Sequence, residues 1–507
     1  MTRMSKINAP DIDLPDGRLF VGGEWETGTG AEITSIFPAD GTVNRIFRGA
    51  SREDGLRAIA SAKAAQADPA WRNLKPHERA RHLYRIADGL EANADRISRI
   101  QTRDTGKTLK ETRALALSAA GTFRYFGAVL ETMDDALTAQ RGDALTMSVW
   151  EPLGLVAAIT PWNSPIASDA QKVAPALAAG NAVLLKPASW APLVSLELAR
   201  IVEEAGLPKG LFSVLPGAGR EIGNLLVEHP DIGRVSFTGG TSTGRQIARQ
   251  AAEKLMPVSL ELGGKSPTIV FEDADPDLAI AGVLYGIFSS TGQSCIAGAR
   301  LFVQRGIYDS FVPRLVRAAE RLRVGHPGDP ATQVSCLVHP DHRAAVETHV
   351  AAALAEGAQL LTGGRRPDDP ALAEGAYYLP TILSGVPNTA RICRDEVFGP
   401  VLVVLPFEDE ADLIAQANDN DYGLACGVWT RDFPKAWRIG RAINTGTVWI
   451  NTYKQFSIST PFGGEKDSGM AREKGREGLR AYQAQKAIYT DLTNAPHPWA
   501  ADLLDGA

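Results

Sequence analysis

The sequence predicts an α/β protein built from two series of alternating strands and helices. Short β-rich runs alternate with helix-like segments rich in alanine, leucine and charged residues. The first series has runs at Leu155–Ile159, Ala182–Leu185, Leu211–Leu215 and Arg234–Phe237. The second has runs at Thr268–Phe271, Arg300–Gln304, Val401–Leu405 and Thr447–Asn451. This alternation indicates βαβ units, mostly parallel sheets with helices on both faces, and ligand sites at the carboxyl ends of the strands.

Length and charge narrow the class of protein. A chain of 507 residues is too long for one hydrophobic core, so we expect two or more domains. Apolar residues make up 44% and charged residues 22%, which is ordinary for a folded protein. A net charge of -6 gives no general attraction to nucleic acid or anionic lipid, so any phosphate recognition must be local.

Neither targeting nor metal chemistry is indicated. The first 17 residues are polar and broken by Pro10 and Pro15, and no stretch is apolar for long enough to span a bilayer, so we expect a cytoplasmic protein. The four cysteines contain no CxxC pair, which argues against disulfides or a zinc cluster. The histidine set His339, His342 and His349 lacks a second ligand cluster, so we expect no metal site.

The flanking segments carry local signals. Ser51–Asp54 reads as a capping box that opens a helix to about Ala67, and a second helix follows Pro76. Arg141–Val149 is typical of an extended hairpin arm, and Gln485–Thr490 of a strand without an obvious partner. Because an unpaired edge is a liability, two lone strands suggest pairing across a subunit boundary.

A glycine-rich loop is the first candidate phosphate site. Phe237–Gly244 follows a predicted strand and enters a helix at about Arg245. Small residues let the backbone approach a pyrophosphate, and a helix N-terminus favours its charge, although a plain glycine-rich turn explains the pattern equally well. A second glycine set at Gly217, Gly219 and Gly223 misses the GxGxxG spacing by one residue, so it indicates little.

Cys295 and Glu261 are the candidates for covalent and acid–base chemistry. A lone cysteine is most often a small buried hydrophobe, but the small polar neighbours of Cys295 favour an accessible thiol, whose thiolate is a nucleophile. Glu261 lies between leucines, where partial desolvation would raise its pKa into the range of a general base. A structural ion pair with Lys265 is the alternative.

Polar residues also follow other predicted strands. Asn163 lies in a rigid loop between two prolines, from which its amide could donate to an oxyanion, and an Asx-turn is the alternative. Lys186 and Ser189 offer a cation and a hydroxyl to ribose or phosphate. Glu396 offers a carboxylate to ribose hydroxyls beside the apolar wall of Phe398.

In this order the motifs resemble the aldehyde dehydrogenase superfamily. The motifs are Pro-Trp-Asn, Lys-Pro-Ala, Phe-Thr-Gly, Glu-Leu-Gly-Gly-Lys, Gly-Gln-Ser-Cys and Glu-Val-Phe-Gly-Pro, and the resemblance runs from Leu19 to Tyr482. It implies two doubly wound α/β domains plus a small β oligomerisation arm, in a homodimer or homotetramer. The implied boundaries are 1–138 and 153–263 for the dinucleotide-binding domain, 264–462 for the catalytic domain, and 139–152 and 483–496 for the arm.

The resemblance also implies a reaction. Cys295 matches the nucleophile that forms a thiohemiacetal and then a thioester, and Glu261 matches the base that activates the hydrolytic water. Asn163 and the backbone N–H of Cys295 match the oxyanion hole, and Lys172 with Glu473 match a proton relay. A CoA-acylating relative generally lacks the glutamate found here at 261, and an idle scaffold protein is the remaining rival.

Cofactor contacts are carried over in the same way. NAD or NADP is implied, and the matching positions are Ile159, Thr160, Pro161, Trp162, Lys186, Ala188, Ser189, Gly219, Phe237, Thr238, Gly239, Gly240, Thr243, Leu262, Glu396 and Phe398. Many NAD-preferring relatives carry a glutamate where this chain has Ser189. Serine removes the repulsion of a 2′-phosphate, so we expect NADP to be accepted.

The substrate channel is implied by position alone. The matching residues are Ser164, Ser168, Asp169, Gln171, Ser294, Ile296, Phe456 and Phe462. One wall is thus polar and potentially anionic and the other aromatic, and no clamp for a substrate carboxylate is expected because Gln171 stands where some relatives carry an arginine. We therefore expect neutral hydroxylated, aromatic or cationic aldehydes to be preferred over fatty aldehydes and semialdehyde acids. The alternative is that these polar side chains merely cap the following helix.

Overall fold

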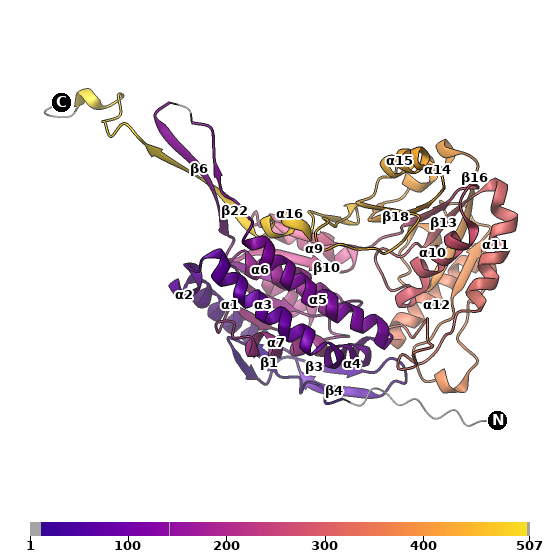
Figure 1. Ribbon diagram of the computed structural model, residues 1–507. Helices are drawn as coiled ribbons and strands as arrows, with labels where there is room; N and C mark the ends of the chain where they lie inside the picture. Colours follow the sequence, from indigo (N-terminus) through magenta and orange to yellow (C-terminus); the bar gives the residue numbers. More distant parts are fainter. Residues whose placement is uncertain (1–11, 141, 504–507) are drawn as a thin grey trace.

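The computed structural model describes residues 12–140 and 142–503 and places two α/β units side by side, with a β arm projecting from the first (Figure 1). The first unit is built on an eight-stranded sheet in the order β2-β1-β9-β8-β7-β10-β11-β21. Its strands are β1 (Leu19–Val21), β2 (Glu24–Glu26), β7 (Leu155–Ile159), β8 (Ala182–Lys186), β9 (Phe212–Val214), β10 (Ile232–Thr238), β11 (Val258–Glu261) and β21 (Gly469–Met470).

The five central strands of this sheet are parallel, which confirms the four strands predicted for the first series. β1 and β21 join its two sides antiparallel, so residues from both ends of the chain complete it. Because β7, β8 and β10 run the same way, the loops that follow them emerge at one edge, next to the second unit. These loops carry the predicted phosphate and oxyanion residues.

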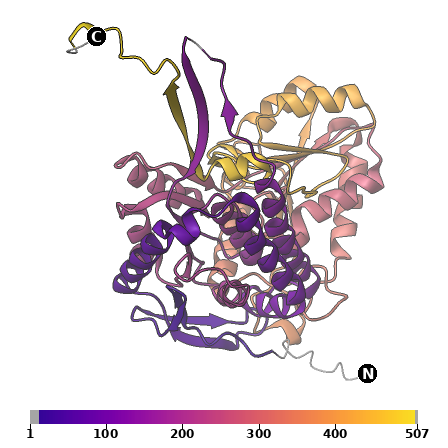
Figure 2. The same ribbon diagram turned by 60° about the vertical axis from the view of Figure 1, so that its left-hand side comes forward.

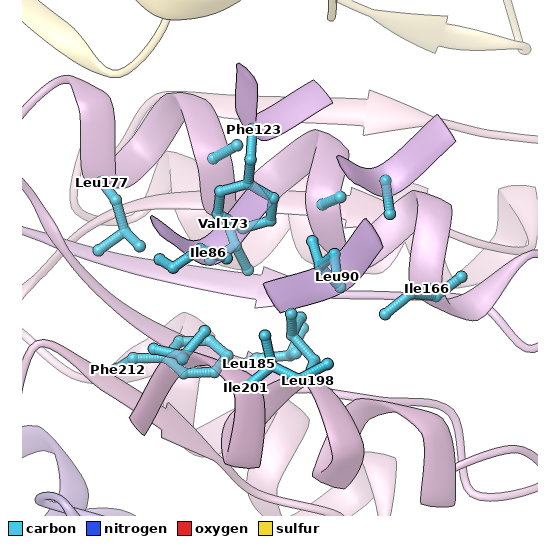
Figure 3. Packing of buried hydrophobic residues seen from close by; sticks show 14 of the residues in the cluster. Ile86, Leu90, Phe123, Ile166, Val173, Leu177, Leu185, Leu198, Ile201 and Phe212 are labelled. Carbon is cyan, nitrogen blue, oxygen red and sulfur yellow. The ribbon is translucent and has the colours of Figure 1, made fainter. Parts of the chain in front are cut away.

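Helices cover both faces of the first sheet. Alternate residues of β7 and β8 face opposite sides: Val156 and Val183 pack with one helix layer, and Leu155 and Leu184 with the other. Figure 3 shows residues of this first layer, among them Phe123, Val173 and Leu185. The first layer consists of α3 (Pro76–Ala92), α4 (Ala94–Thr105), α5 (Leu109–Leu130), α6 (Pro165–Ala178) and α7 (Leu193–Glu204). The layer on the opposite face consists of α1 (Arg52–Ala67), α8 (Asn224–Glu228) and α9 (Thr241–Ala252).

The capping box at Ser51 and the helix after Pro76 are both present, and that helix is followed closely by a second one. The capping box at Ser51 is present, with the Ser51 hydroxyl accepting from the Asp54 amide. The helix after Pro76 stops at Ala92, because Asn93 leaves the helical conformation and its side chain donates to the carbonyl of Gly89. A separate helix then begins at Ala94.

The second unit repeats the design on a seven-stranded sheet ordered β14-β15-β16-β13-β12-β18-β19, parallel except for β14. Its strands are β12 (Pro267–Val270), β13 (Arg300–Gln304), β14 (Gln359–Thr362), β15 (Thr381–Ser384), β16 (Val401–Phe407), β18 (Ala425–Trp429) and β19 (Thr447–Ile450). The helices α10 (Pro276–Phe288) and α11 (Arg305–Glu320) cover one face, and α12 (Pro340–Ala355), α14 (Glu410–Asn418) and α15 (Phe433–Ala442) the other. The four strands predicted for the second series are therefore confirmed.

The arm corrects a prediction. β6 (Ala144–Pro152) pairs antiparallel with β22 (Gln483–Asp491) along its whole length, and β5 (Ala136–Leu137) pairs with its other edge. The two strands are therefore not without a partner, since each pairs with the other within one chain, and pairing across a subunit boundary stays a prediction. Both views show the arm standing away from the two units (Figures 1 and 2). Arg141, at the predicted start of the arm, lies outside the described residues.

Short elements connect these layers. They are β3 (Glu32–Ile36) with β4 (Val43–Arg48), β17 (Tyr422–Gly423) with β20 (Glu465–Lys466), α2 (Pro69–Arg72), α13 (Arg391–Arg394), α16 (Gly475–Arg480), a π-helical turn at Gly219–Gly223 and 3₁₀ turns at Ser289–Gly292, Pro370–Leu372 and Ala501–Leu503. Among the helices of the described residues, none has the length and apolarity needed to cross a membrane. The predicted division into domains stays a prediction, and its first 11 residues lie outside the described part.

Candidate active site

A cavity of about 370 Å³ lies where the strand ends of the first sheet face the second unit. One end, which we call the cofactor end, is lined by Pro161, Trp162, Thr238, Gly239, Gly240, Leu262, Gly263, His342, Glu396 and Phe398. The other, which we call the substrate end, is lined by Leu115, Ser118, Ser164, Ala167, Ser168, Gln171, Ile296, Phe456, Phe462 and Lys474. Asn163, Glu261, Ser294, Cys295 and Glu473 complete the lining.

Cys295 enters the cavity from a sharply turned loop of the second unit. It follows the 3₁₀ turn Ser289–Gly292, and its side chain is half-buried. Gly264 lets this loop approach, since a Cβ there would lie 2.3 Å from the carbonyl oxygen of Cys295. Burial first, and then the carboxylates of Glu396 and Glu261, raise the pKa of the thiol to about 12. The thiol must therefore lose its proton before it can act as a nucleophile.

Asn163 is fixed beside the cysteine loop. Its Nδ2 donates to the carbonyl oxygen of Gln293 at 3.1 Å, two residues before Cys295. An amide nitrogen carries two protons, so one holds the loop and the other is free to serve an oxyanion. Ser164, next in sequence, begins α6 without a side-chain capping bond and lines the cavity instead.

Glu261 ends β11 inside the cavity. Its residue is only 4% exposed, and neither carboxylate oxygen has a hydrogen-bond partner among the described residues. The alternative ion pair is absent there, because Lys265 also leaves its Nζ without a partner. Burial first, and then the charge of Glu473, raise the pKa of Glu261, as a general base at neutral pH requires.

The expected relay pair is formed. Nζ of Lys172 lies 2.5 Å from Oε1 of Glu473, and both atoms are 3.1 Å from the hydroxyl of Ser236. Lys172 is fully buried on α6 and lies behind the cavity wall, whereas Glu473 reaches the cavity. Lys172 and Glu473 are therefore in contact, but only Glu473 lines the cavity.

The cofactor end combines aromatic faces with a carboxylate. Trp162 meets Phe398 and His342, with ring centroids 5.2 and 5.1 Å apart. Glu396 accepts a hydrogen bond of 2.8 Å from the amide of Gly264, and burial raises the pKa of its carboxyl to about 7. His342, singled out earlier only for metal binding, instead holds the Phe398 carbonyl at 2.9 Å, and the described residues contain no cluster that could hold a metal.

The remaining predicted cofactor residues lie outside this cavity. Ile159, Thr160, Lys186 and Phe237 are buried at the strand ends. Ala188, Ser189 and Gly219 lie in the segments that follow β8 and β9, and Thr243 lies in the first turn of α9. A Cβ at Gly219 or Gly240 would meet no atom within 4 Å, so both glycines face open space. Nζ of Lys186 donates to the carbonyl of Pro187 at 3.0 Å, and burial lowers the pKa of Lys186 to about 8.

The substrate end corrects the placement of Asp169. Ser168 and Gln171 share the cavity face of α6, whereas Asp169 is turned away by about 100° around the helix axis. It is fully buried, and its Oδ2 accepts from the hydroxyl of Ser195 at 2.6 Å. The prediction that Asp169 lines the channel is therefore wrong, and this wall is polar without being anionic.

Sequence reasoning missed several lining residues. Leu115 and Ser118 come from α5, far from any motif, where only their three-residue spacing hinted at a shared face. Lys474 directly follows Glu473, and its Nζ lies 4.0 Å from the ring centroid of Phe456 and 5.1 Å from that of Phe462. The expectation that the channel has no clamp for a carboxylate was based on Gln171 alone and did not take this cation into account.

Known proteins share this fold and much of this sequence. The sequence pattern of the Aldehyde dehydrogenase family matches residues 25–488. Betaine aldehyde dehydrogenase of Bacillus subtilis is 38% identical over 95% of this chain and 99% of its own, and that of Mesorhizobium japonicum is 43% identical over 93% and 96%. The structure of betaine aldehyde dehydrogenase from Staphylococcus aureus in complex with NAD+ matches with a TM-score of 0.94 at 36% identity, covering 96% of this chain and 97% of that one.

Proposed function

The chain belongs to the aldehyde dehydrogenase family, and on that premise we propose which of its residues carry out the reaction. It is an NAD(P)-dependent aldehyde dehydrogenase with a catalytic cysteine. It oxidises an aldehyde to a carboxylic acid through a thiohemiacetal and a thioester, which water then hydrolyses. The aldehyde itself and the tasks of individual residues are the proposal.

The observation that carries the proposal is the convergence of Cys295, Asn163 and Glu261 on one cavity. The Cys295 thiol gives its proton to a water molecule and attacks the aldehyde carbon as a thiolate, and the free amide proton of Asn163 stabilises the oxyanion. Glu261 takes a proton from the water that hydrolyses the thioester, and its missing hydrogen-bond partners leave both oxygens available. Glu473, held by Lys172, is the group to which Glu261 passes that proton.

The cofactor residues are proposed from their position. Trp162, Glu396 and Phe398 hold the nicotinamide half, and Lys186, Ser189 and Gly219 the adenosine half. The nicotinamide, when bound, supplies the hydride acceptor. NADP is accepted alongside NAD, because Ser189 brings no charge against a 2′-phosphate and Lys186, with a pKa of about 8, is protonated at neutral pH.

Two further proposals concern the assembly of the protein and its cellular compartment. Within the described residues the outer edge of β22 has no strand partner, and Ile488 and Tyr489 are exposed along it. We propose that the arm serves assembly into a dimer or tetramer through this edge. The described cysteines are all free, which suits the cytoplasm, where a catalytic thiol stays reduced.

A panel of aldehydes, each supplied with and without CoA, tests the reaction class. Reduced cofactor without any need for CoA supports hydrolysis, as the presence of Glu261 predicts, whereas a requirement for CoA would favour acyl transfer. The absence of turnover with every aldehyde would favour an idle scaffold.

Replacing the nucleophile is the matching control. Cys295→Ala should abolish oxidation and the pre-steady-state burst of reduced cofactor while leaving cofactor binding intact. Stopped-flow absorbance measures the burst, and Cys336→Ala, which changes a buried cysteine away from the cavity, should keep it. A normal burst from Cys295→Ala would mean that another cysteine is the nucleophile.

The names of the relatives make betaine aldehyde a candidate substrate. Its trimethylammonium group would have to approach the aromatic wall of Phe456 and Phe462, beside which this chain places the ammonium of Lys474. This contact weighs against betaine aldehyde and leads to the inference below.

A further inference from the structure

Lys474 is a buried cation at the substrate end of the cavity. Its residue is 7% exposed and lines the cavity with Ser168, Gln171 and Cys295. The backbone on both sides of it is fixed to the loop that carries the aromatic wall. Glu473 and Phe462 exchange two backbone hydrogen bonds of 2.7 and 2.8 Å, and the amide of Gly475 donates to Ile458 at 2.9 Å. The backbone at Lys474 is therefore fixed, and its side chain extends along the aromatic wall.

This ammonium has no direct ion-pair partner among the described residues. Within residues 12–140 and 142–503, Lys474 has neither an ion pair nor a side-chain hydrogen bond. The adjacent carboxylate of Glu473 is engaged by Lys172 at 2.5 Å, and Asp169 points into the core. A buried charge without a partner is costly, so it indicates a partner that arrives with the ligand.

The aromatic wall is already occupied by the protein's own cation. Nζ of Lys474 lies over the ring of Phe456, 4.0 Å from its centroid, and 5.1 Å from that of Phe462. Ring faces of this kind are what a quaternary ammonium ligand would need. A cationic substrate would have to displace Lys474 and also bear its repulsion.

The opposite wall suits an anion. Ser118, Ser164, Ser168 and Gln171 offer hydroxyl and amide donors, and no carboxylate of the described residues lines the substrate end. Lys474 itself has φ 61° and ψ 177°, a conformation that non-glycine residues rarely adopt. Burial lowers the pKa of Lys474, while Glu473, Glu261 and Cys295 act to raise it.

We propose that Lys474 is a specificity-determining residue that binds a carboxylate carried by the aldehyde substrate, so that this enzyme prefers aldehyde acids over cationic aldehydes. The inference rests on the proposed function, because it places the aldehyde at Cys295. It replaces the expectation from the sequence that semialdehyde acids would be poor substrates.

The first test uses the wild-type enzyme with NAD+. Aldehydes of four to six carbons that end in a carboxylate are compared with unbranched neutral aldehydes of equal length and with an aldehyde that bears a trimethylammonium group. At the best-fitting length, kcat/KM for the carboxylate should exceed that for its neutral counterpart by roughly 10- to 100-fold, the range of one charge-assisted hydrogen bond. The cationic aldehyde should be the poorest of the three.

The variants separate recognition from a general effect on the site. Lys474→Met should remove the advantage of the carboxylate over the neutral aldehyde of equal length and improve the cationic aldehyde relative to both. Lys474→Arg should keep much of the advantage, and Lys466→Met, which removes a cation outside the cavity, should change nothing.

Each contrary result has its own meaning. If wild-type enzyme oxidises neutral aldehydes without preferring any carboxylate, the inference is overturned while the proposed function stands. An equal loss of kcat/KM for all three classes in Lys474→Met would also overturn it, because that result indicates an effect on Glu261 rather than on the substrate. If no aldehyde yields reduced cofactor, the proposed function itself fails. The wild-type comparison decides the matter even if a variant does not fold.

Discussion

The two ends of the cavity are built in different ways. The cofactor end comes from short motifs at the ends of neighbouring parallel strands, such as Pro161–Trp162 after β7 and Thr238–Gly240 after β10. The substrate end is assembled from α5, α6, the segment that carries Phe456 and Phe462, and Lys474 near the C-terminus. The first end is thus set by local sequence, whereas the second depends on how distant segments pack.

The charges of the two ends differ as well. Glu396 faces the cofactor end, with its carboxyl pKa raised to about 7, and Lys474 faces the substrate end. Cys295 and Glu261 lie between them. Changes to the central residues should therefore affect every aldehyde alike, whereas changes at either end should affect only the ligand that binds there.

The largest effect is expected from Glu261→Gln. Loss of the base should slow thioester hydrolysis by roughly 100- to 10,000-fold for every aldehyde, while one equivalent of acyl adduct still forms. Because the pKa of Glu261 is raised, wild-type turnover should increase as pH rises through that pKa, and the variant should lose this increase. Mass spectrometry after a single turnover checks for the adduct on Cys295. A fall in turnover for one class of aldehyde only would contradict the claim that Glu261 acts on every substrate alike.

Asn163→Ala should have the next largest effect. Removal of one oxyanion donor lowers kcat by roughly 100- to 1,000-fold, again for all aldehydes. Both Asn163→Ala and Asn163→Asp lose the bond to Gln293, and Asn163→Asp, which cannot donate but keeps the size of the side chain, separates the loss of the donor from the loss of volume. Steady-state kinetics with a neutral and a carboxylate aldehyde measure both. Full activity of either variant would remove Asn163 from the mechanism.

The smallest effect is expected from a substitution at Ser189, which should change the preference between NADP and NAD. Ser189→Glu should lower kcat/KM for NADP about tenfold relative to NAD, because the new carboxylate repels the 2′-phosphate. The ranking of aldehydes should not change, and Ser189→Gln controls for size. A wild-type preference for NAD of many hundredfold would contradict the premise, and a changed aldehyde ranking would show that the two ends are coupled.

Local sequence patterns predicted the α/β class, four strands of each sheet and the residues of the contiguous motifs. They did so because strand periodicity and rigid loops are local properties, and because Cys295, Glu261 and Asn163 each follow such an element. They could also place Glu396 and Phe398 by their motif, although the His342 contact that supports Phe398 was not visible.

Side-chain direction, long-range strand pairing and the position of Lys474 became clear only from the tertiary structure. A helix position one residue along turns its side chain by about 100°, so Asp169 faces the core while Ser168 faces the cavity. The partner of β22 is β6, more than 300 residues earlier, and no local pattern encodes that pairing. Lys474 reaches the cavity only because the backbone of Glu473 pairs with Phe462, and its charge becomes decisive only because packing leaves it without a partner.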